Sequence, residues 1–156
     1  MKKIGIIALL LILGTGVFAQ SFTNGLPKGA IQLTAGLGLN SYGLPLFVQM
    51  DYSLTDDITL SPYAGLSLWS SDNQLRLAAY ADYHFNRLLN LPKIWDVYAG
   101  LNTGFQIHFG AQPGTSALKA GIQLGGRYFW NKHWGINLQF GGGLDYGGRI
   151  GVSHRF

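Results

Sequence analysis

Residues 95–109 read WDVYAGLNTGFQIHF, and apolar residues alternate with polar or small ones through the whole stretch. Every second residue from Trp95 to Phe109 lies on one face, which is almost entirely apolar. The other face begins at Asp96 and ends at His108, with one tyrosine and otherwise glycine, asparagine and glutamine between them. Alternation with a period of two predicts a β-strand that has one apolar and one polar environment.

The same alternation recurs along the chain in about eight segments that are separated by turn residues. An even number of strands with short connections predicts antiparallel neighbours, and eight strands close into a barrel narrow enough for side chains to fill. We therefore predict an all-β fold, an eight-stranded antiparallel up-and-down transmembrane β-barrel. The expected strands are 30–40, 46–54, 58–68, 75–85, 95–109, 118–130, 134–141 and 149–156.

Alternation alone does not decide whether the apolar face lies inside a soluble barrel or outside a transmembrane one. Glycines crowd the polar face, as the interior of a narrow barrel requires, and no Asp, Lys or Arg lies on the apolar face. A lipid-facing Arg or Lys at the bilayer midplane would cost about 2–4 kcal/mol. Aromatic residues gather near one rim as an interfacial girdle is expected to do, with Phe109 and Tyr146 near the other rim. The predicted girdle is Tyr52, Tyr83, Phe85, Trp95, Tyr128, Trp130, Trp134 and Phe156.

The first 19 residues have the pattern of a cleaved secretory signal peptide. Lys2 and Lys3 precede an apolar run that is too short to span a membrane as a helix, and Ala19 ends a cleavage motif. We expect residues 20–156 to form a single barrel domain in the bacterial outer membrane. The turns 55–57, 86–93 and 131–133 would then face the periplasm, and the loops 41–45, 70–73, 110–116 and 142–147 the exterior.

Composition excludes several classes of protein. The chain has no cysteine, so it has neither disulfides nor a lipoprotein anchor. Its formal net charge is +4, but no run of basic residues is longer than two, which argues against a nucleic-acid partner. The four histidines are scattered over different segments, so we predict no metal site, and we see no cofactor motif.

The chain resembles the small eight-stranded outer-membrane barrels of the OmpX and OmpA-barrel type. Its last residues, IGVSHRF at 150–156, resemble the C-terminal signal that the barrel-insertion machinery reads, carried by Ile150, Val152, His154 and Phe156. The resemblance implies two partners, outer-membrane lipid and that machinery during biogenesis. The expected external loops are shorter than the long surface-binding loops of many family members, which weakens an adhesin function.

Charged or titratable residues also fall on the predicted interior face. Buried charges in a filled barrel must pair, and we expect Arg127 to pair with Asp82 or Asp96, and Asp51 with Arg155. The alternative is a narrow porin-like pore for small polar or anionic solutes. The predicted interior set is Asp51, Arg76, Asp82, His84, Asp96, His108, Lys119, Arg127, Arg149 and Arg155.

No arrangement of residues predicts catalysis. Ser153 and His154 are adjacent in a strand and point to opposite faces, and the chain has no Glu for a triad that uses one. His108 with Ser116 and Asp145 is the remaining candidate for a nucleophilic site. We expect no enzyme and no catalytic residue.

The leading hypothesis is a non-enzymatic structural or accessory subunit of a larger outer-membrane assembly. Leu88 and Leu89, in the turn 86–93, would form its periplasmic docking site, or the turn would merely cap the barrel mouth. The pore is the second hypothesis, and a lipid-binding or lipid A-modifying barrel is the third.

Overall fold

The computed structural model describes residues 26–39, 44–69, 71–144 and 147–156. The predicted signal peptide at 1–19, most of the predicted loop 41–45, and Asp145 and Tyr146 lie outside the described residues. In the part of the chain that is described, no helix is long and apolar enough to cross a membrane.

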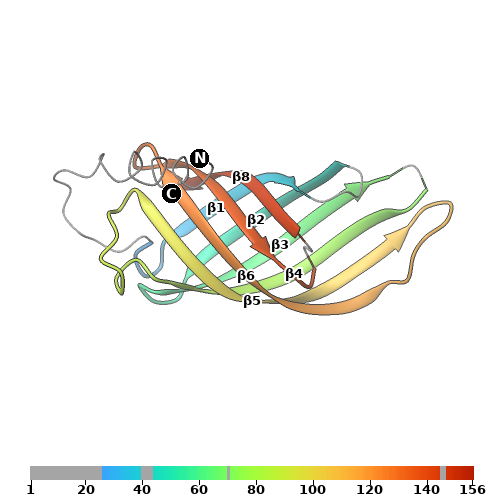
Figure 1. The fold of residues 1–156 in the computed structure, drawn as a ribbon, viewed down its shortest axis with the longest axis horizontal. Coiled ribbons are helices and arrows are strands. Elements are labelled where there is room, and N and C mark those ends of the chain that lie inside the picture. Colours follow the sequence, from blue (N-terminus) through green and yellow to red (C-terminus); the bar gives the residue numbers. More distant parts are fainter. Residues whose placement is uncertain (1–25, 40–43, 70, 145–146) are drawn as a thin grey trace, which may run out of the picture.

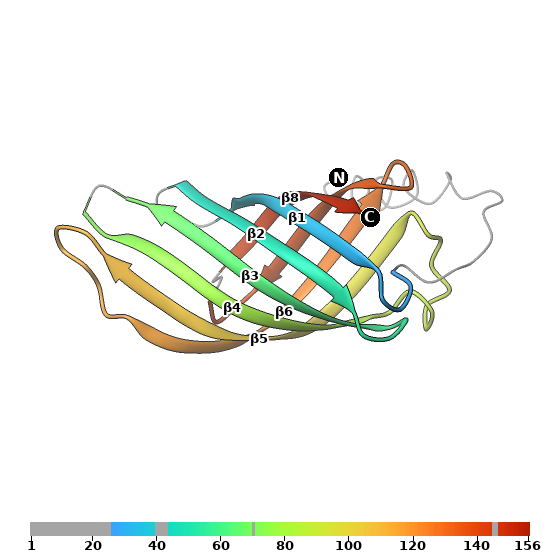
Figure 2. The ribbon, with the colours of Figure 1, turned by 180° about the vertical axis from the view of Figure 1, so that it is seen from behind.

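Eight strands follow one another along the chain, and each is hydrogen-bonded antiparallel to the next. The last strand pairs with the first, which closes the barrel and confirms the predicted fold. The strands run obliquely to the long axis of the molecule (Figure 1), and the view from behind shows the same wall continuing around it (Figure 2). Their bounds are β1 (Ile31–Gly38), β2 (Leu44–Ser53), β3 (Ile58–Leu68), β4 (Asn73–His84), β5 (Trp95–Phe109), β6 (Ala117–Phe129), β7 (Trp134–Gly141) and β8 (Gly147–Arg155).

The two faces of the wall have opposite chemistry, and the apolar face is outside. Leu33, Leu77 and Ile122 are between 37% and 69% exposed, whereas Gln32 and Asn137 on the inner face are at most 2% exposed. A water-soluble barrel would bury its apolar face. This one buries polar side chains and presents leucine, isoleucine and valine to its surroundings, as a barrel in lipid does. Where all eight strands are present, closure leaves no unpaired sheet edge, as strands in hydrocarbon require.

Both the start of β1 and the C-terminus lie at the end that carries the turns 54–57, 85–94 and 130–133. Following the predicted orientation, we call this the periplasmic end and the opposite one the external end. Pro62 in β3 disturbs the ladder, because proline has no N–H to donate. The pairing of β2 with β3 is interrupted at Pro62. It stops at Gln49 opposite Tyr63 and resumes at Tyr52 opposite Leu60.

The strands differ in height at the external end. β5 and β6 have 15 and 13 residues, whereas β1 and β7 each have 8. The pairing of β6 with β7 starts at Gln123 opposite Gly141, so residues 117–122 extend past the end of β7. In Figure 1 the β5–β6 hairpin accordingly reaches farther than the neighbouring strands at that end. Every residue from Phe109 to Ala120 is exposed, on both faces.

Glycine makes room inside the barrel for aromatic rings at two positions. A Cβ on Gly125 would lie 2.3 Å from the ring of Tyr98, and a Cβ on Gly65 would lie 2.5 Å from the hydroxyl of Tyr63. These distances are too short for any larger side chain. The glycines of the predicted inner face therefore let buried tyrosines fill the lumen.

Candidate functional site

A group of polar side chains in the periplasmic half of the lumen connects strands on different sides of the barrel. At its centre lies Arg127 of β6, which is 1% exposed. Its Nη2 donates to Asp51 of β2 at 2.6 Å, and its Nη1 donates to Asp96 of β5 at 2.9 Å. Both carboxylates are completely buried. One guanidinium thus bridges two carboxylates from opposite sides of the barrel.

Further side chains complete the environment of these carboxylates. The Nδ1 of His84 lies 2.7 Å from Asp96, and its Nε2 lies 3.0 Å from the hydroxyl of Thr59. Gln32 and Gln49 donate to Asp51 at 3.0 and 2.6 Å. Strands β1 to β6 each contribute at least one member of this group. We call it the cross-barrel cluster, and its members are Gln32, Gln49, Asp51, Thr59, His84, Asp96 and Arg127.

A second arginine fills the lumen beside the cluster. The guanidinium carbon of Arg149 lies 4.8, 4.9 and 4.7 Å from the ring centres of Phe47, Tyr63 and Tyr80. Its Nη2 also donates to Gln139 at 2.7 Å and to Gln49. Desolvated cation–π contacts of this kind are worth about 2 kcal/mol. We call Arg149 and these three rings the arginine cage.

One of the two expected ion pairs differs from the prediction. Asp51 pairs with Arg127 and not with Arg155, because the side chain of Gln32 lies between them. Its Nε2 donates to Asp51, and its Oε1 accepts from the Nε of Arg155 at 3.3 Å. Asp82 accepts a 2.6 Å hydrogen bond from Gln123 instead of pairing with Arg127. The expected pair of Arg127 with Asp96 is present.

Most of the predicted interior charges do point inward. Asp51, Arg76, Asp82, His84, Asp96, Arg127 and Arg149 are all at most 3% exposed, while His108 and Arg155 are partly buried near the two mouths. Lys119 is exposed, which corrects its assignment to the interior. It lies on β6 above the end of β7, where the ring of strands is incomplete and both faces of β6 are exposed.

His108 has a carboxylate partner that the sequence did not indicate. Its Nδ1 lies 2.8 Å from Asp72, a residue of the loop that precedes β4. The hydrogen bond from His108 holds the pKa of Asp72 below its ordinary value. The hydroxyl of Ser116 accepts the backbone N–H of His108 at 2.9 Å. Asp145, the acid that we expected here, lies outside the described residues.

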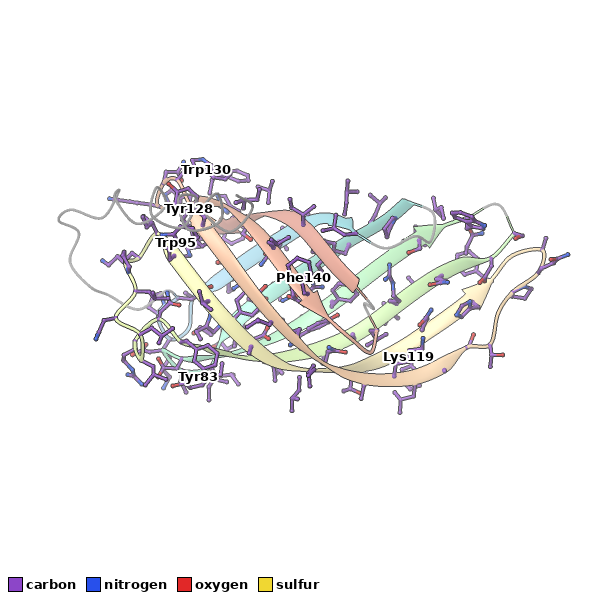
Figure 3. All side chains as sticks on the ribbon, in the orientation of Figure 1. Tyr83, Trp95, Lys119, Tyr128, Trp130 and Phe140 are labelled. Carbon is purple, nitrogen blue, oxygen red and sulfur yellow. The ribbon has the colours of Figure 1, made fainter. Side chains whose placement is uncertain are left out.

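The predicted girdle residues are outward-facing at the periplasmic end. Figure 3 shows Tyr83, Trp95, Tyr128 and Trp130 gathered at that end, far from Lys119. The ring centres of Trp95 and Tyr128 are 4.9 Å apart. At the external rim Phe109 is 44% exposed and Trp69, which the prediction did not include, is 51% exposed.

The residues of the predicted insertion signal lie on the outer face of β8. Ile150, Val152 and Phe156 are exposed. The ring of His154 packs between Trp134 and Phe156, with its centre 4.5 and 4.7 Å from the centres of their rings. The intervening Ser153 is buried and hydrogen-bonds Thr34 at 2.8 Å, so it does not face His154. Among the described residues no group of three or more His, Asp or Glu could hold a metal ion.

No protein-family model matches this chain, and no curated protein is significantly similar to it. Solved structures do match. The N-terminal β-barrel domain of Pseudomonas aeruginosa OprF is 21% identical, with a TM-score of 0.63, and the match covers 83% of this chain and 98% of that one. Pseudomonas aeruginosa OprG is 12% identical, with a TM-score of 0.62 and coverage of 86% and 99%.

A de novo designed transmembrane β-barrel matches as well, at 15% identity and a TM-score of 0.60, over 86% of this chain and all of the design. Identities this low show the fold alone. Together with the apolar exterior, they show that this chain has the fold of the small eight-stranded β-barrels of bacterial outer membranes.

Proposed function

We propose that this protein is a non-enzymatic, non-conducting outer-membrane barrel that serves as a structural or accessory subunit of a larger outer-membrane assembly. The observation that carries the non-conducting part is the filled lumen. Arg127 is bound to two carboxylates across the barrel, and the arginine cage closes the section beside it. Tyr98 and Phe129 occupy further parts of the interior and are at most 1% exposed.

A solute would have to break these contacts to pass. Separating Arg127 from Asp51 or Asp96 would leave a buried charge without its partner, at a cost of about 3–5 kcal/mol. Opening the arginine cage adds the loss of its ring contacts. A static lumen of this kind supports a plug more strongly than the narrow pore of the second hypothesis.

Planar-bilayer recording of the purified barrel tests this part of the proposal. We expect no steady conductance from the native protein. A steady conductance whose ion selectivity changes in the variant Arg127→Glu would contradict the proposal and favour the pore. The variant Lys119→Glu is the control, since it makes the same charge change on the exposed part of β6.

The accessory part of the proposal is supported by the turn between β4 and β5. Leu88 and Leu89 are 67% and 57% exposed there. The turn is nevertheless ordered by side-chain bonds: Asn86 donates to the Trp95 carbonyl at 2.6 Å, and Arg87 pairs with Asp57 of the neighbouring turn. Two leucines held in a fixed, exposed position suit the apolar patch of a partner protein better than a simple cap of the mouth.

Purification of the tagged protein from native outer membranes in a mild detergent tests the docking site. We expect a large outer-membrane protein to co-purify in stoichiometric amount and to be lost from the double variant Leu88→Asp, Leu89→Asp. Leu54→Asp is the matched control, because Leu54 is 44% exposed in another periplasmic turn. A barrel that purifies alone, or a partner that both variants retain, would contradict this proposal.

A further inference from the structure

The periplasmic mouth contains a positively charged pocket of about 500 Å³. Lys93, Lys132 and Arg155 line it, together with Ile94, Phe129 and Trp130, and no acidic residue is among the described residues that line it. The three cations come from the end of the β4–β5 turn, the β6–β7 turn and the end of β8. Three convergent cations without an acid favour a bound anion.

Arg155 has an unused donor at this pocket. Its guanidinium carbon lies 3.4 Å above the centre of the Phe129 ring, its Nε donates to Gln32, and its Nη1 is 3.5 Å from the carbonyl of Lys93. Its Nη2 is buried and has no hydrogen-bond partner among the described residues. Because an unsatisfied buried donor costs free energy, a turn of the guanidinium toward an anionic oxygen in the pocket would gain the acceptor that it lacks.

An apolar groove of about 590 Å³ lies on the outer wall next to this pocket. It is lined by Trp95 and Tyr128 at the girdle and by Leu138 and Phe140 farther along the wall. In Figure 3, Trp95, Tyr128 and Trp130 lie together at the periplasmic end, and Phe140 lies toward the middle of the barrel. Gly126 in β6 also lines the groove, and it has no side chain to fill it.

The pocket and the groove meet at one place on the rim. Ile94 of the pocket is followed by Trp95 of the groove, and Tyr128 of the groove is followed by Phe129 of the pocket. A molecule that occupied both would need an anionic head at the membrane surface and an apolar chain directed into the hydrocarbon. That is the chemistry of a phospholipid in the periplasmic leaflet.

We propose that the pocket and groove together bind one anionic phospholipid, with its phosphate among Lys93, Lys132 and Arg155 and one acyl chain along the groove. This site is independent of the accessory role and of the docking leucines. A free phosphate would use the same cations but would leave the groove empty, so the acyl chain distinguishes the two ligands.

The quenching of tryptophan fluorescence by brominated acyl chains can test the site. In a Trp69→Phe, Trp134→Phe background the two remaining tryptophans are Trp95 in the groove and Trp130 in the pocket. The barrel is reconstituted in phosphatidylcholine vesicles that contain either brominated phosphatidylglycerol or brominated phosphatidylcholine at equal mole fraction. We expect the anionic lipid to quench more strongly at low mole fraction.

The double variant Lys93→Gln, Lys132→Gln should lower the relative affinity for phosphatidylglycerol by about thirtyfold, the scale of two lysine–lipid attractions. Both lysines are exposed, so folding should be unaffected. The control Lys28→Gln, Lys119→Gln removes the same charge from exposed positions outside the pocket and should change nothing.

Three results would overturn the proposal. Equal quenching by the two lipids would mean that the site has no selectivity for the anionic head. Selectivity that survives in the Lys93→Gln, Lys132→Gln variant would place it elsewhere. Loss of selectivity on addition of inorganic phosphate, at an ionic strength matched with chloride, would mean that the pocket is a site for free anions.

Discussion

The periplasmic half of the barrel and the projecting part of β6 are built from the same alternating pattern, yet only the first has a buried face. Around Arg127 the neighbouring strands are present on every side and polar side chains are at most a few per cent exposed. Around Lys119, β7 has already ended and both faces of β6 are exposed. Alternation therefore decides which face a residue takes, whereas the heights of the neighbouring strands decide whether that face is buried.

Removal of the central arginine should have the largest effect on this contrast. Arg127→Met leaves Asp51 and Asp96 buried without their shared partner, and we expect it to lower the free energy of unfolding by about 3–5 kcal/mol. Lys119→Met should change it by no more than about 0.5 kcal/mol, as surface substitutions usually do. Reversible urea unfolding in lipid vesicles measures both. Equal stability of the two variants would mean that the cross-barrel cluster does not hold the fold.

A pair of glycine substitutions should give the next largest difference. The Cβ of Gly125→Val would overlap the Tyr98 ring, and overpacking of this kind costs about 1–3 kcal/mol. Gly142, in the loop after β7, has no atom within 4 Å of its ideal Cβ position. We expect Gly142→Val to keep the native melting temperature and Gly125→Val to lower it, as followed by the heat-induced gel-mobility shift. A tolerated Gly125→Val would argue against a tightly filled lumen.

The smallest expected effect concerns Asp72 and His108 at the external end. Because the pKa of Asp72 is lowered in the folded protein, the contact stabilises the loop above the ordinary carboxyl pKa. The stabilisation is lost as the pH falls through the lowered value. The protection factor of the Gly114 amide, which donates to Asp72, should therefore fall on acidification once the exchange rate is corrected for the pH dependence of intrinsic exchange. In Asp72→Asn this acid-induced loss of protection should disappear, with Asp56→Asn at the other end as the control.

The sequence predicted the strands and their faces well, for a physical reason. Lipid outside the barrel favours apolar residues and the narrow lumen inside favours polar or small ones. Because successive residues face opposite sides, the alternation within each strand shows which residues face outward. The predicted bounds of β3, β5 and β7 agree with those of the structure. Their regular alternation allowed only one assignment of residues to the inner and outer faces.

The contacts inside the barrel were harder to predict because they depend on how far the strands are staggered around the ring. Arg127 and Asp51 are 76 residues apart in sequence, and no local pattern indicates that they meet. The position of Gln32 between Asp51 and Arg155 also depends on the stagger of the strands, so the sequence did not indicate it. The pairing of Asn73 with Phe109 brings Asp72 close to His108, and that register follows only from the paired strands.

The accessibility of an introduced cysteine tests the filled lumen most directly, since the chain has no cysteine of its own. Ser61 is completely buried on the inner face of β3, and Ser61→Cys is a conservative change. With a small membrane-impermeant maleimide, we predict that Lys119→Cys reacts at once and that Ser61→Cys reacts only after unfolding. Labelling of folded Ser61→Cys at the rate of Lys119→Cys would mean that water and solutes pass through the lumen, and would contradict the account.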